Sequence, residues 1–236
     1  PMANIVLIHG AWHGGWCWRL VRQDLEARGH KVFTPSLTGL GDRVHLMHVE
    51  VDLETHINDV VGLIEAEELD DVILCGHSYG GMVITGVADA VGDRIKSLVY
   101  LDALVPENGQ SALSLLSPEG AESFRKKAAS TGDGWKIPPI PAAAFGVTDP
   151  DLAAWIDRRC VPHPLASMEQ PLALTHPARR DIPCTYILAE DFPNFKPVHA
   201  RLAEDPAWTC HSLPCGHDVM AIMPKELSDI LDGRSI

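Results

Sequence analysis

The sequence predicts an α/β fold in which a mostly parallel sheet carries helices on both faces and an inserted helical lid. Short apolar runs such as Ile5–Ile8 and Ser97–Leu101 alternate with segments whose apolar residues recur at helical spacing. The alternation stops between Glu107 and about Ile182, where half of the 18 prolines fall, and then resumes. We therefore expect a single domain over 1–236, with a lid inserted at about 107–182.

Six apolar, β-favouring runs predict the strands, at 5–9, 31–35, 71–75, 97–101, 184–189 and 208–213. Periodic apolar residues predict the helices, near 18–29, 53–64, 82–88, 198–203 and 225–231, with helical pieces of the insertion near 118–129 and 150–160. Strands that alternate with helices are typical of a parallel sheet with helices on both faces.

Composition excludes several classes of partner. The net charge of −13 argues against nucleic acids and acidic membrane surfaces, and no apolar run is long enough to span a bilayer. The chain passes directly from Pro1–Asn4 into a strand, so we expect no signal peptide. The six cysteines are scattered without a C-x-x-C motif, which favours reduced core residues of a cytoplasmic protein. Nothing indicates the oligomeric state.

The stretch Gly76-His77-Ser78-Tyr79-Gly80 has the G-x-S-x-G spacing of a nucleophile elbow. An apolar run precedes it and a helical pattern follows it, as this motif requires. Such a turn leaves the serine in a strained conformation with its hydroxyl exposed, beside the positive end of a helix. A Gly-rich strand-to-helix turn without chemistry is the simpler alternative, but the flanking pattern favours Ser78 as a nucleophile.

The Gly-rich loop His9–Trp16 follows the first predicted strand. A loop in this place supplies one backbone donor for a negatively charged reaction intermediate, and the residue after the nucleophile supplies the other. By position we assign these donors to the backbone of Ala11 and Tyr79. His9 and His13 suggest a metal site, but no third ligand has motif spacing, so we expect no metal.

A serine nucleophile needs a base, and the base needs a carboxylate to orient it. His217 follows the last predicted strand in a Gly-His-Asp turn, and histidine titrates near operating pH. Asp191, after the penultimate strand, is our first choice of acid, and Asp102, after the strand before the insertion, is the alternative. Glu190 is a third choice. Asp218 adjoins the base and is expected to shape its turn.

These residues resemble the α/β-hydrolase superfamily over essentially the whole chain. Within it, the chain resembles the plant methyl esterase and hydroxynitrile lyase branch more closely, and it is closer still to short bacterial relatives such as the benzimidazole carbamate (carbendazim-type) hydrolases. The segments that carry it include His9–Trp16, Gly76–Gly81, Ala189–Asp191, Gly216–Met220 and, for the bacterial relatives, 65–74, 159–162 and 205–208.

The resemblance implies a serine hydrolase with Ser78, His217 and an acid, without a metal or an organic cofactor. The lyases of the branch carry a lysine after the catalytic histidine and a threonine in the loop of the backbone donors, where this chain has Asp218 and Ala11. We therefore expect hydrolysis of small apolar esters or methyl carbamates rather than release of cyanide. A non-catalytic ligand-binding relative is the alternative from another class.

Four aromatic residues are candidates for the substrate pocket. Trp12 lies in the loop after the first strand, and Trp135, Phe145 and Trp155 lie in the insertion. Together they predict a flat apolar pocket for a compact aromatic or alkyl group. The alternative is that they only pack the insertion onto the body of the protein.

Overall fold

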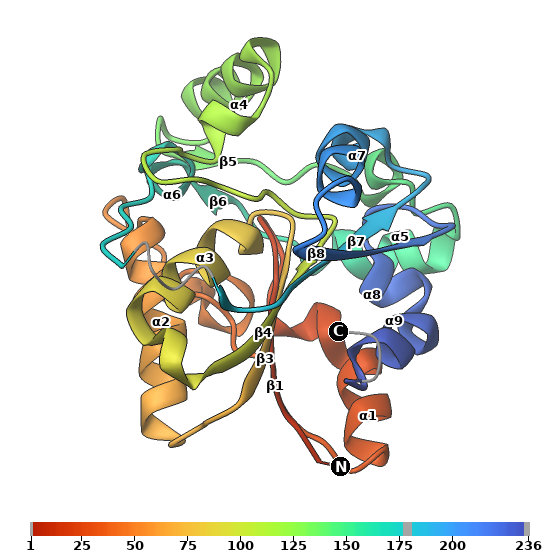
Figure 1. Ribbon diagram of the computed structural model, residues 1–236. Coiled ribbons are helices and arrows are strands. Elements are labelled where there is room, and N and C mark those ends of the chain that lie inside the picture. Colours follow the sequence, from red (N-terminus) through yellow and green to blue (C-terminus); the bar gives the residue numbers. More distant parts are fainter. Residues whose placement is uncertain (1, 177–180, 234–236) are drawn as a thin grey trace.

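A single parallel sheet forms the centre of the molecule. The computed structural model describes residues 2–176 and 181–233. In this part of the chain, six parallel strands lie in the spatial order β2-β1-β3-β4-β7-β8 (Figure 1). They are β1 (Asn4–Ile8), β2 (Lys31–Phe33), β3 (Val72–His77), β4 (Ile95–Leu101), β7 (Cys184–Ala189) and β8 (Trp208–Leu213).

The central strands are apolar on both faces because helices cover both. All six residues of β3 are buried, as are the last four of β1. Successive side chains point to opposite faces of a strand. Ile5 and Leu7 accordingly join one core cluster, and Val6 and Ile8 join the other. The edge strand β2 ends at Phe33, earlier than the predicted limit at Pro35, since proline has no N–H for the ladder.

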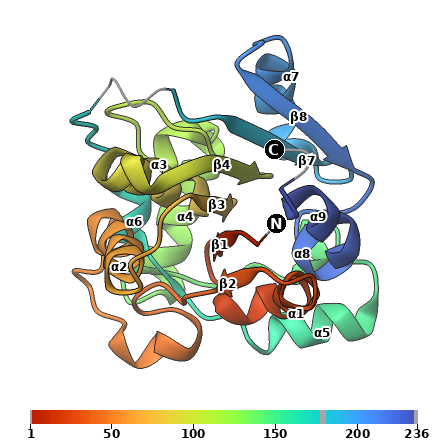
Figure 2. The ribbon, with the colours of Figure 1, turned by 60° about the horizontal axis from the view of Figure 1, so that its bottom comes forward.

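Helices form a layer on each face of the sheet (Figures 1 and 2). One layer holds α1 (Arg19–Ala27), α8 (Val219–Ile222) and α9 (Pro224–Leu231). The other holds α2 (Leu53–Ala66) and α3 (Gly80–Val91), and α7 (Lys196–Ala203) lies beside β7 and β8. No helix within residues 2–176 or 181–233 combines the length and apolar character that crossing a lipid bilayer requires.

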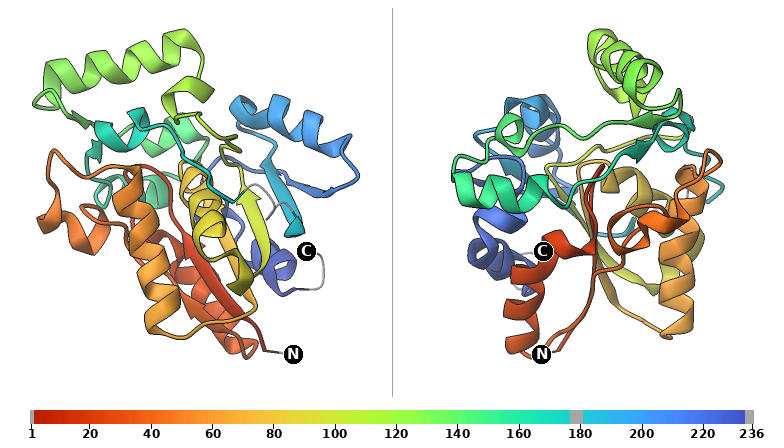
Figure 3. Two further views of the ribbon diagram at one scale, coloured as in Figure 1. Left: turned by 60° about the vertical axis from the view of Figure 1, so that its left-hand side comes forward. Right: turned by 180° about the vertical axis from the view of Figure 1, so that it is seen from behind.

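The chain after Asp102 and before β7, residues 103–183, is called the inserted segment here. It contributes α4 (Pro118–Thr131), β5 (Lys136–Ile137), α5 (Pro150–Asp157), β6 (His163–Pro164) and α6 (Leu165–Glu169). The short antiparallel pair β5–β6 was not predicted from sequence. Figure 3 shows α4 standing above the carboxyl ends of the strands. Short 3-10 turns complete the fold: η1 (Gly15–Trp18), η2 (Gly41–Leu46), η3 (Gly92–Arg94), η4 (Leu113–Leu115), η5 (Ala142–Phe145) and η7 (Pro193–Phe195).

The order of strands reverses at β1, which has β2 on one side and β3 on the other. Ligands of parallel α/β sheets bind beyond the carboxyl ends of the strands at such a switch point. The loops that leave β1 and β3 here approach each other closely: a Cβ on Gly10 would lie 2.9 Å from Cβ of Ser78. The fold therefore brings the His9–Trp16 loop against Ser78.

Candidate active site

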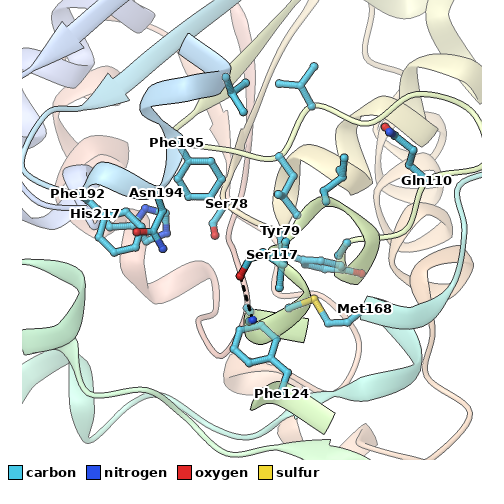
Figure 4. Close-up of a pocket in the computed structure, with 18 of the residues that line it drawn as sticks. Ser78, Tyr79, Gln110, Ser117, Phe124, Met168, Phe192, Asn194, Phe195 and His217 are labelled. Atoms are coloured by element: carbon cyan, nitrogen blue, oxygen red, sulfur yellow. Dashed lines mark hydrogen bonds between the residues drawn. The ribbon is translucent and has the colours of Figure 1, made fainter. Parts of the chain in front are cut away.

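Ser78 stands on a sharp turn between β3 and α3. Its backbone φ is 55°, a left-handed conformation that costs a serine about 1–2 kcal/mol. The Ser78 N–H donates to the Leu101 carbonyl (3.2 Å), and the Ser78 carbonyl accepts from Gly81 (3.1 Å) and Leu104 (3.2 Å). These bonds hold the strained turn, and Ser78 lines the cavity shown in Figure 4.

His217, in the loop after β8, lines the same cavity. Its Nδ1 lies 2.6 Å from Oδ2 of Asp102, and both residues are buried. A carboxylate accepts, so Nδ1 carries the proton and Nε2 is the acceptor of the ring. The other carboxylate oxygen, Oδ1, accepts from the Ala189 N–H at 3.0 Å. Asp102 is thereby fixed from two sides, and it fixes the tautomer of His217.

The carboxylate that contacts His217 is the alternative, Asp102, and not Asp191, which we preferred. Asp102 follows β4 with a φ of 42°, and its N–H donates to the Ile187 carbonyl at 2.7 Å. This turn carries its side chain beneath the end of β7 toward the loop after β8. Asp191 is exposed, and so is Glu190, which accepts from Ser212 Oγ at 2.7 Å. Asp102 is buried, whereas Asp191 and Glu190 are exposed, and the order of residues in the sequence does not reveal this difference.

Aromatic rings surround the His217 imidazole. The ring centroids of Phe192 and Phe195 lie 4.5 Å and 5.5 Å away, and Phe195 is almost parallel to the imidazole (Figure 4). Phe145 lies at 5.3 Å, and its carbonyl accepts from the His217 N–H at 2.7 Å. These contacts keep water from most of the ring and hold it in one orientation.

Ala11 and Tyr79, the predicted backbone donors, both line the cavity beside Ser78. Tyr79 directly precedes α3, so its N–H belongs to the positive end of that helix. The Tyr79 ring turns into the core, where its hydroxyl donates to Nδ1 of His56 at 2.8 Å. Burial raises the pKa of this hydroxyl, which therefore stays protonated. The donor role of the two backbone N–H groups stays a prediction.

His9 holds the peptide group that carries the Ala11 N–H. Its Nδ1 donates to the Gly10 carbonyl at 2.8 Å, and its Nε2 accepts from the Leu37 N–H at 3.0 Å. Burial lowers the pKa of His9 to about 3, so the ring is neutral at pH 7. Both nitrogens are engaged in these bonds. Across residues 2–176 and 181–233, no three His, Cys, Asp or Glu side chains are grouped to hold a metal ion.

The cavity at the carboxyl ends of β1 and β3 has a volume of about 620 Å³. Its walls are mainly apolar, with the body of the protein on one side and the inserted segment on the other (Figure 4). Its polar lining side chains include Gln110, Ser117 and Asn194, together with the charged Glu107 and Arg201. A pocket of this size and lining suits a small, neutral, apolar molecule.

Two of the four predicted pocket aromatics line this cavity. Trp12 and Phe145 do so, with ring centroids 5.9 Å apart. Trp135 and Trp155 are absent from its walls, which corrects that part of the prediction. Trp155 instead packs edge-on against Trp16 at 5.3 Å, because α5 faces the α8 side of the body. The Trp135 ring lies 4.9 Å from the Lys136 ammonium.

Sequence reasoning missed several residues of the cavity wall. Gly120 and Phe124 of α4 line it four residues apart, the spacing of one helix face, and this pattern was available in the sequence. Phe192 and Phe195 follow Asp191 in the loop after β7, and their position beyond a strand end was a second signal. Met168 of α6 gave no comparable signal.

Comparison with known proteins identifies the family. The profile of the alpha/beta hydrolase family matches residues 5–230. The chain belongs to this family. A carbendazim hydrolyzing esterase of Nocardioides sp. (strain SG-4G) is 51% identical to this α/β-hydrolase, with 98% of each chain covered. Methylesterase 2 of Arabidopsis thaliana is 25% identical, with 97% of this chain and 94% of the relative covered.

Solved structures agree with these sequence matches. An extracellular α/β-hydrolase from a Paenibacillus species has a TM-score of 0.85 at 27% identity, covering 98% of this chain and 99% of the other. A pyrethroid hydrolase from Sphingobium faniae has a TM-score of 0.75 at 26% identity, with 99% of both chains covered. The predicted fold, the predicted family and the hydrolase class are therefore confirmed.

Proposed function

We propose that this α/β-hydrolase cleaves small apolar carboxylic esters or methyl carbamates through a covalent intermediate on Ser78. The observation that carries the proposal is the buried hydrogen bond of 2.6 Å between His217 and Asp102, at a cavity that Ser78 also lines. It gives the histidine the tautomer that a general base needs beside a serine nucleophile.

The chemistry then follows the roles of the groups. Nε2 of His217 takes the Ser78 proton as Oγ bonds to the substrate carbonyl carbon, and the N–H groups of Ala11 and Tyr79 bind the resulting oxyanion. His217 returns the proton to the leaving oxygen, so a methyl ester or methyl carbamate releases methanol. Water, activated by the same Nε2, cleaves the acyl or carbamoyl enzyme, and Ser78 recovers its proton.

The substrate class rests on the cavity and on the relatives. A volume of about 620 Å³ with apolar walls accepts an aromatic or short alkyl group but not a long lipid chain. The 51% identical relative is named for carbendazim, a flat aromatic methyl carbamate, which makes this compound the first substrate to try. A carbamate carbonyl is less electrophilic than that of an ester, so it depends more on well-aimed oxyanion donors.

The proposal also covers the binding partners and the cellular location of the protein. We expect a small-molecule substrate, with no organic cofactor, metal, nucleic acid or membrane surface required. All six cysteines are free thiols, which favours a reducing compartment and hence the cytoplasm.

The test combines product analysis with trapping of the intermediate. Carbendazim and short p-nitrophenyl esters are the substrates, and intact-protein mass spectrometry after a rapid quench detects an acyl or carbamoyl adduct on Ser78. Ser78→Ala should lose the adduct and about 10³-fold or more of the turnover.

The matched control is Ser97→Ala. Ser97 is a buried serine of β4 whose Oγ has no partner among the described residues, so its loss should leave turnover within about two-fold. A Ser78→Ala protein that keeps more than about a tenth of the activity contradicts the proposal. So does a wild-type protein that binds these compounds without releasing any leaving group.

A further inference from the structure

The peptide group between Ala11 and Trp12 is held at both of its polar ends by buried histidines. Its carbonyl, that of Ala11, accepts from Nδ1 of His13 at 2.8 Å. Its N–H, that of Trp12, donates to Nδ1 of His163 at 3.4 Å. His13 and His163 are both almost inaccessible to solvent. Each histidine connects this peptide to a different part of the protein.

His13 connects the peptide to the loop of His217. Its second nitrogen, Nε2, contacts Oδ2 of Asp218 at 2.8 Å. A carbonyl and a carboxylate only accept, so both nitrogens of His13 donate and the ring is a cation. Burial opposes this charge, but the adjacent Asp218 carboxylate outweighs it and raises the pKa of His13. Despite burial, the His13 cation likewise keeps the pKa of Asp218 well below its usual range.

His163 connects the same peptide to the inserted segment. Its Nδ1 accepts from Trp12, so Nε2 carries the proton and donates to Ser167 Oγ at 2.8 Å. The Ser167 hydroxyl in turn donates to the Pro164 carbonyl at 2.7 Å, which completes the chain of donors. Burial holds the pKa of His163 well below its usual range, so the ring stays neutral. The two histidines that hold the peptide therefore differ in charge: His13 is a cation and His163 is neutral.

The clamp opposes a local strain. Trp12 has a φ of 66°, a conformation that costs a bulky residue about 1–3 kcal/mol. Without external bonds the loop would relax toward a more common conformation and turn the neighbouring Ala11 N–H. The Trp12 indole N–H adds a further bond, to the Ile137 carbonyl of β5 at 3.0 Å. Ala11 is itself 4% exposed and lines the cavity.

We propose that His163 and the His13–Asp218 ion pair are positioning residues that fix the Ala11 N–H in the geometry of the oxyanion site. The proposal rests on the proposed function. Neither histidine lines the cavity, so neither contacts the substrate. Asp218 adjoins His217, so the pair also sets the spacing between the oxyanion donor and the general base.

A positioning role makes a specific kinetic prediction. The oxyanion exists only in the tetrahedral transition state and its intermediates, so a misaimed N–H lowers kcat and leaves KM nearly unchanged. Deleting a donor outright costs about 10²–10³ in rate, and misaiming one should cost about 10- to 100-fold. An inhibitor that forms a tetrahedral oxyanion on Ser78 should lose affinity by the same factor.

His163 provides the sharpest pair of variants. His163→Leu removes the acceptor for Trp12 and should lower kcat on a short p-nitrophenyl ester about 10- to 100-fold. Binding of an aryl trifluoromethyl ketone, which adds to Ser78 as a hemiketal oxyanion, should weaken by the same factor. His163→Gln can accept from Trp12 through Oε1 and donate to Ser167 through Nε2, so it should restore most of both.

The ion pair is tested with His13→Phe and Asp218→Asn. His13→Phe removes the bond to the Ala11 carbonyl and should resemble His163→Leu. Asp218→Asn lets His13 become neutral while its Nδ1 still donates to Ala11, so a loss of only about 3- to 10-fold is expected. If Asp218→Asn loses more activity than His13→Phe, the role assigned to the ion pair is wrong.

The matched control is His30→Leu at the opposite end of the sheet. His30 also accepts a backbone N–H through Nδ1, from Ala3 at 3.0 Å, and it also contacts an aspartate, Asp232, through Nε2. Its loss should lower the melting temperature without changing kcat or ketone binding. Equal kinetic losses in His30→Leu and His163→Leu overturn the proposal, as does a lower kcat with unchanged ketone binding.

Failure of the proposed function has a different signature. In that case the wild-type protein neither hydrolyses the ester nor forms the Ser78 adduct. Where the wild-type protein does both and His163→Leu matches it in kcat, only the positioning role is wrong. If His163→Leu does not fold, the comparison of His163→Gln with Asp218→Asn decides, since only Asp218→Asn should lose ketone affinity.

Discussion

The sheet body and the inserted segment supply different parts of the candidate site. Ser78, Asp102 and His217 lie at the ends of β3, β4 and β8, where parallel strands meet at one edge of the sheet. The inserted segment supplies side chains such as Phe124 and Met168, which form walls of the cavity. We infer that the body determines how fast any substrate reacts, whereas the segment determines which substrates enter.

The two regions are nevertheless bonded to each other. The N–H of His217 in the body donates to the carbonyl of Phe145 in the segment at 2.7 Å. Trp12 in turn donates from its indole to Ile137 and from its backbone to His163. Three predictions test how far the two regions act separately.

The largest effect is expected from the carboxylate in the body. In Asp102→Asn, the amide keeps Oδ1 toward the Ala189 N–H and donates Nδ2 to His217 Nδ1, which forces the proton of the imidazole onto Nε2. Nε2 of His217 then cannot accept the Ser78 proton, so kcat should fall about 10³- to 10⁴-fold for every ester and carbamate. Steady-state kinetics on a panel of substrates measures the loss.

Asp191→Asn is the matched control for this change. Asp191 is exposed and follows the adjacent strand, so its variant should stay within about two-fold of the wild type. If Asp191→Asn is crippled and Asp102→Asn is nearly normal, the geometry described here does not govern the reaction. If Asp102→Asn lost kcat for one substrate only, the inference that the body determines the rate for every substrate would be wrong.

Sequence predicted the body better than the segment because strands and elbows are local signals. The runs of β3 and β4 and the turn at Ser78 can be recognised from neighbouring residues alone. The choice between Asp102 and Asp191 could not, since both follow strands and both precede His217. What separates them is a turn that buries one side chain and leaves the other in water.

The cavity walls that the segment supplies depend on packing between short elements that are distant in the sequence. Trp155 is as apolar as Trp12, but the orientation of α5 directs it toward Trp16. The buried histidines of both regions show the same limit. His9, His13 and His163 have the same side chain, and their charge states follow from acceptors that the fold assembles. Residue type alone carries no such information.

The second effect concerns stability in acid, in both regions. The folded protein keeps His9 neutral with a pKa of about 3, whereas the unfolded chain takes up a proton near the ordinary value of 6.5. Stability from His9 is therefore complete above pH 6.5 and is lost as the pH falls toward 3. The expected slope is about 1.4 kcal/mol per pH unit for each such group.

His9→Gln and His163→Gln should each remove about one such slope between pH 6 and pH 4, measured by urea unfolding. Burial lowers the pKa of His163 as well, so the sign is the same in the segment. In both variants, urea should unfold the body and the segment together in one cooperative transition. Two separate transitions would show that the segment unfolds independently.

The smallest effect is expected in the segment, where it should alter selectivity. Phe124 of α4 lines the cavity and meets Trp12 edge-on, with ring centroids 5.7 Å apart. Phe124→Ala should raise KM for an aromatic ester or carbamate about 10-fold, since an aromatic contact contributes about 0.5–1.5 kcal/mol beyond its buried area. The rate on methyl acetate, an ester without an aromatic ring, should stay within about two-fold.

Chain length completes the test of the segment. In the wild type, rates should fall once the acyl chain exceeds roughly six to eight carbons, because the cavity cannot hold more. Phe124→Ala should move this limit to longer chains, while Trp135→Ala, outside the cavity, should not. Rates that climb with chain length through palmitate in the wild type would contradict a closed pocket, because they would require a site open to lipid. Equal shifts in both variants would mean that α4 acts through the stability of the segment, since a wall contact is lost only with Phe124.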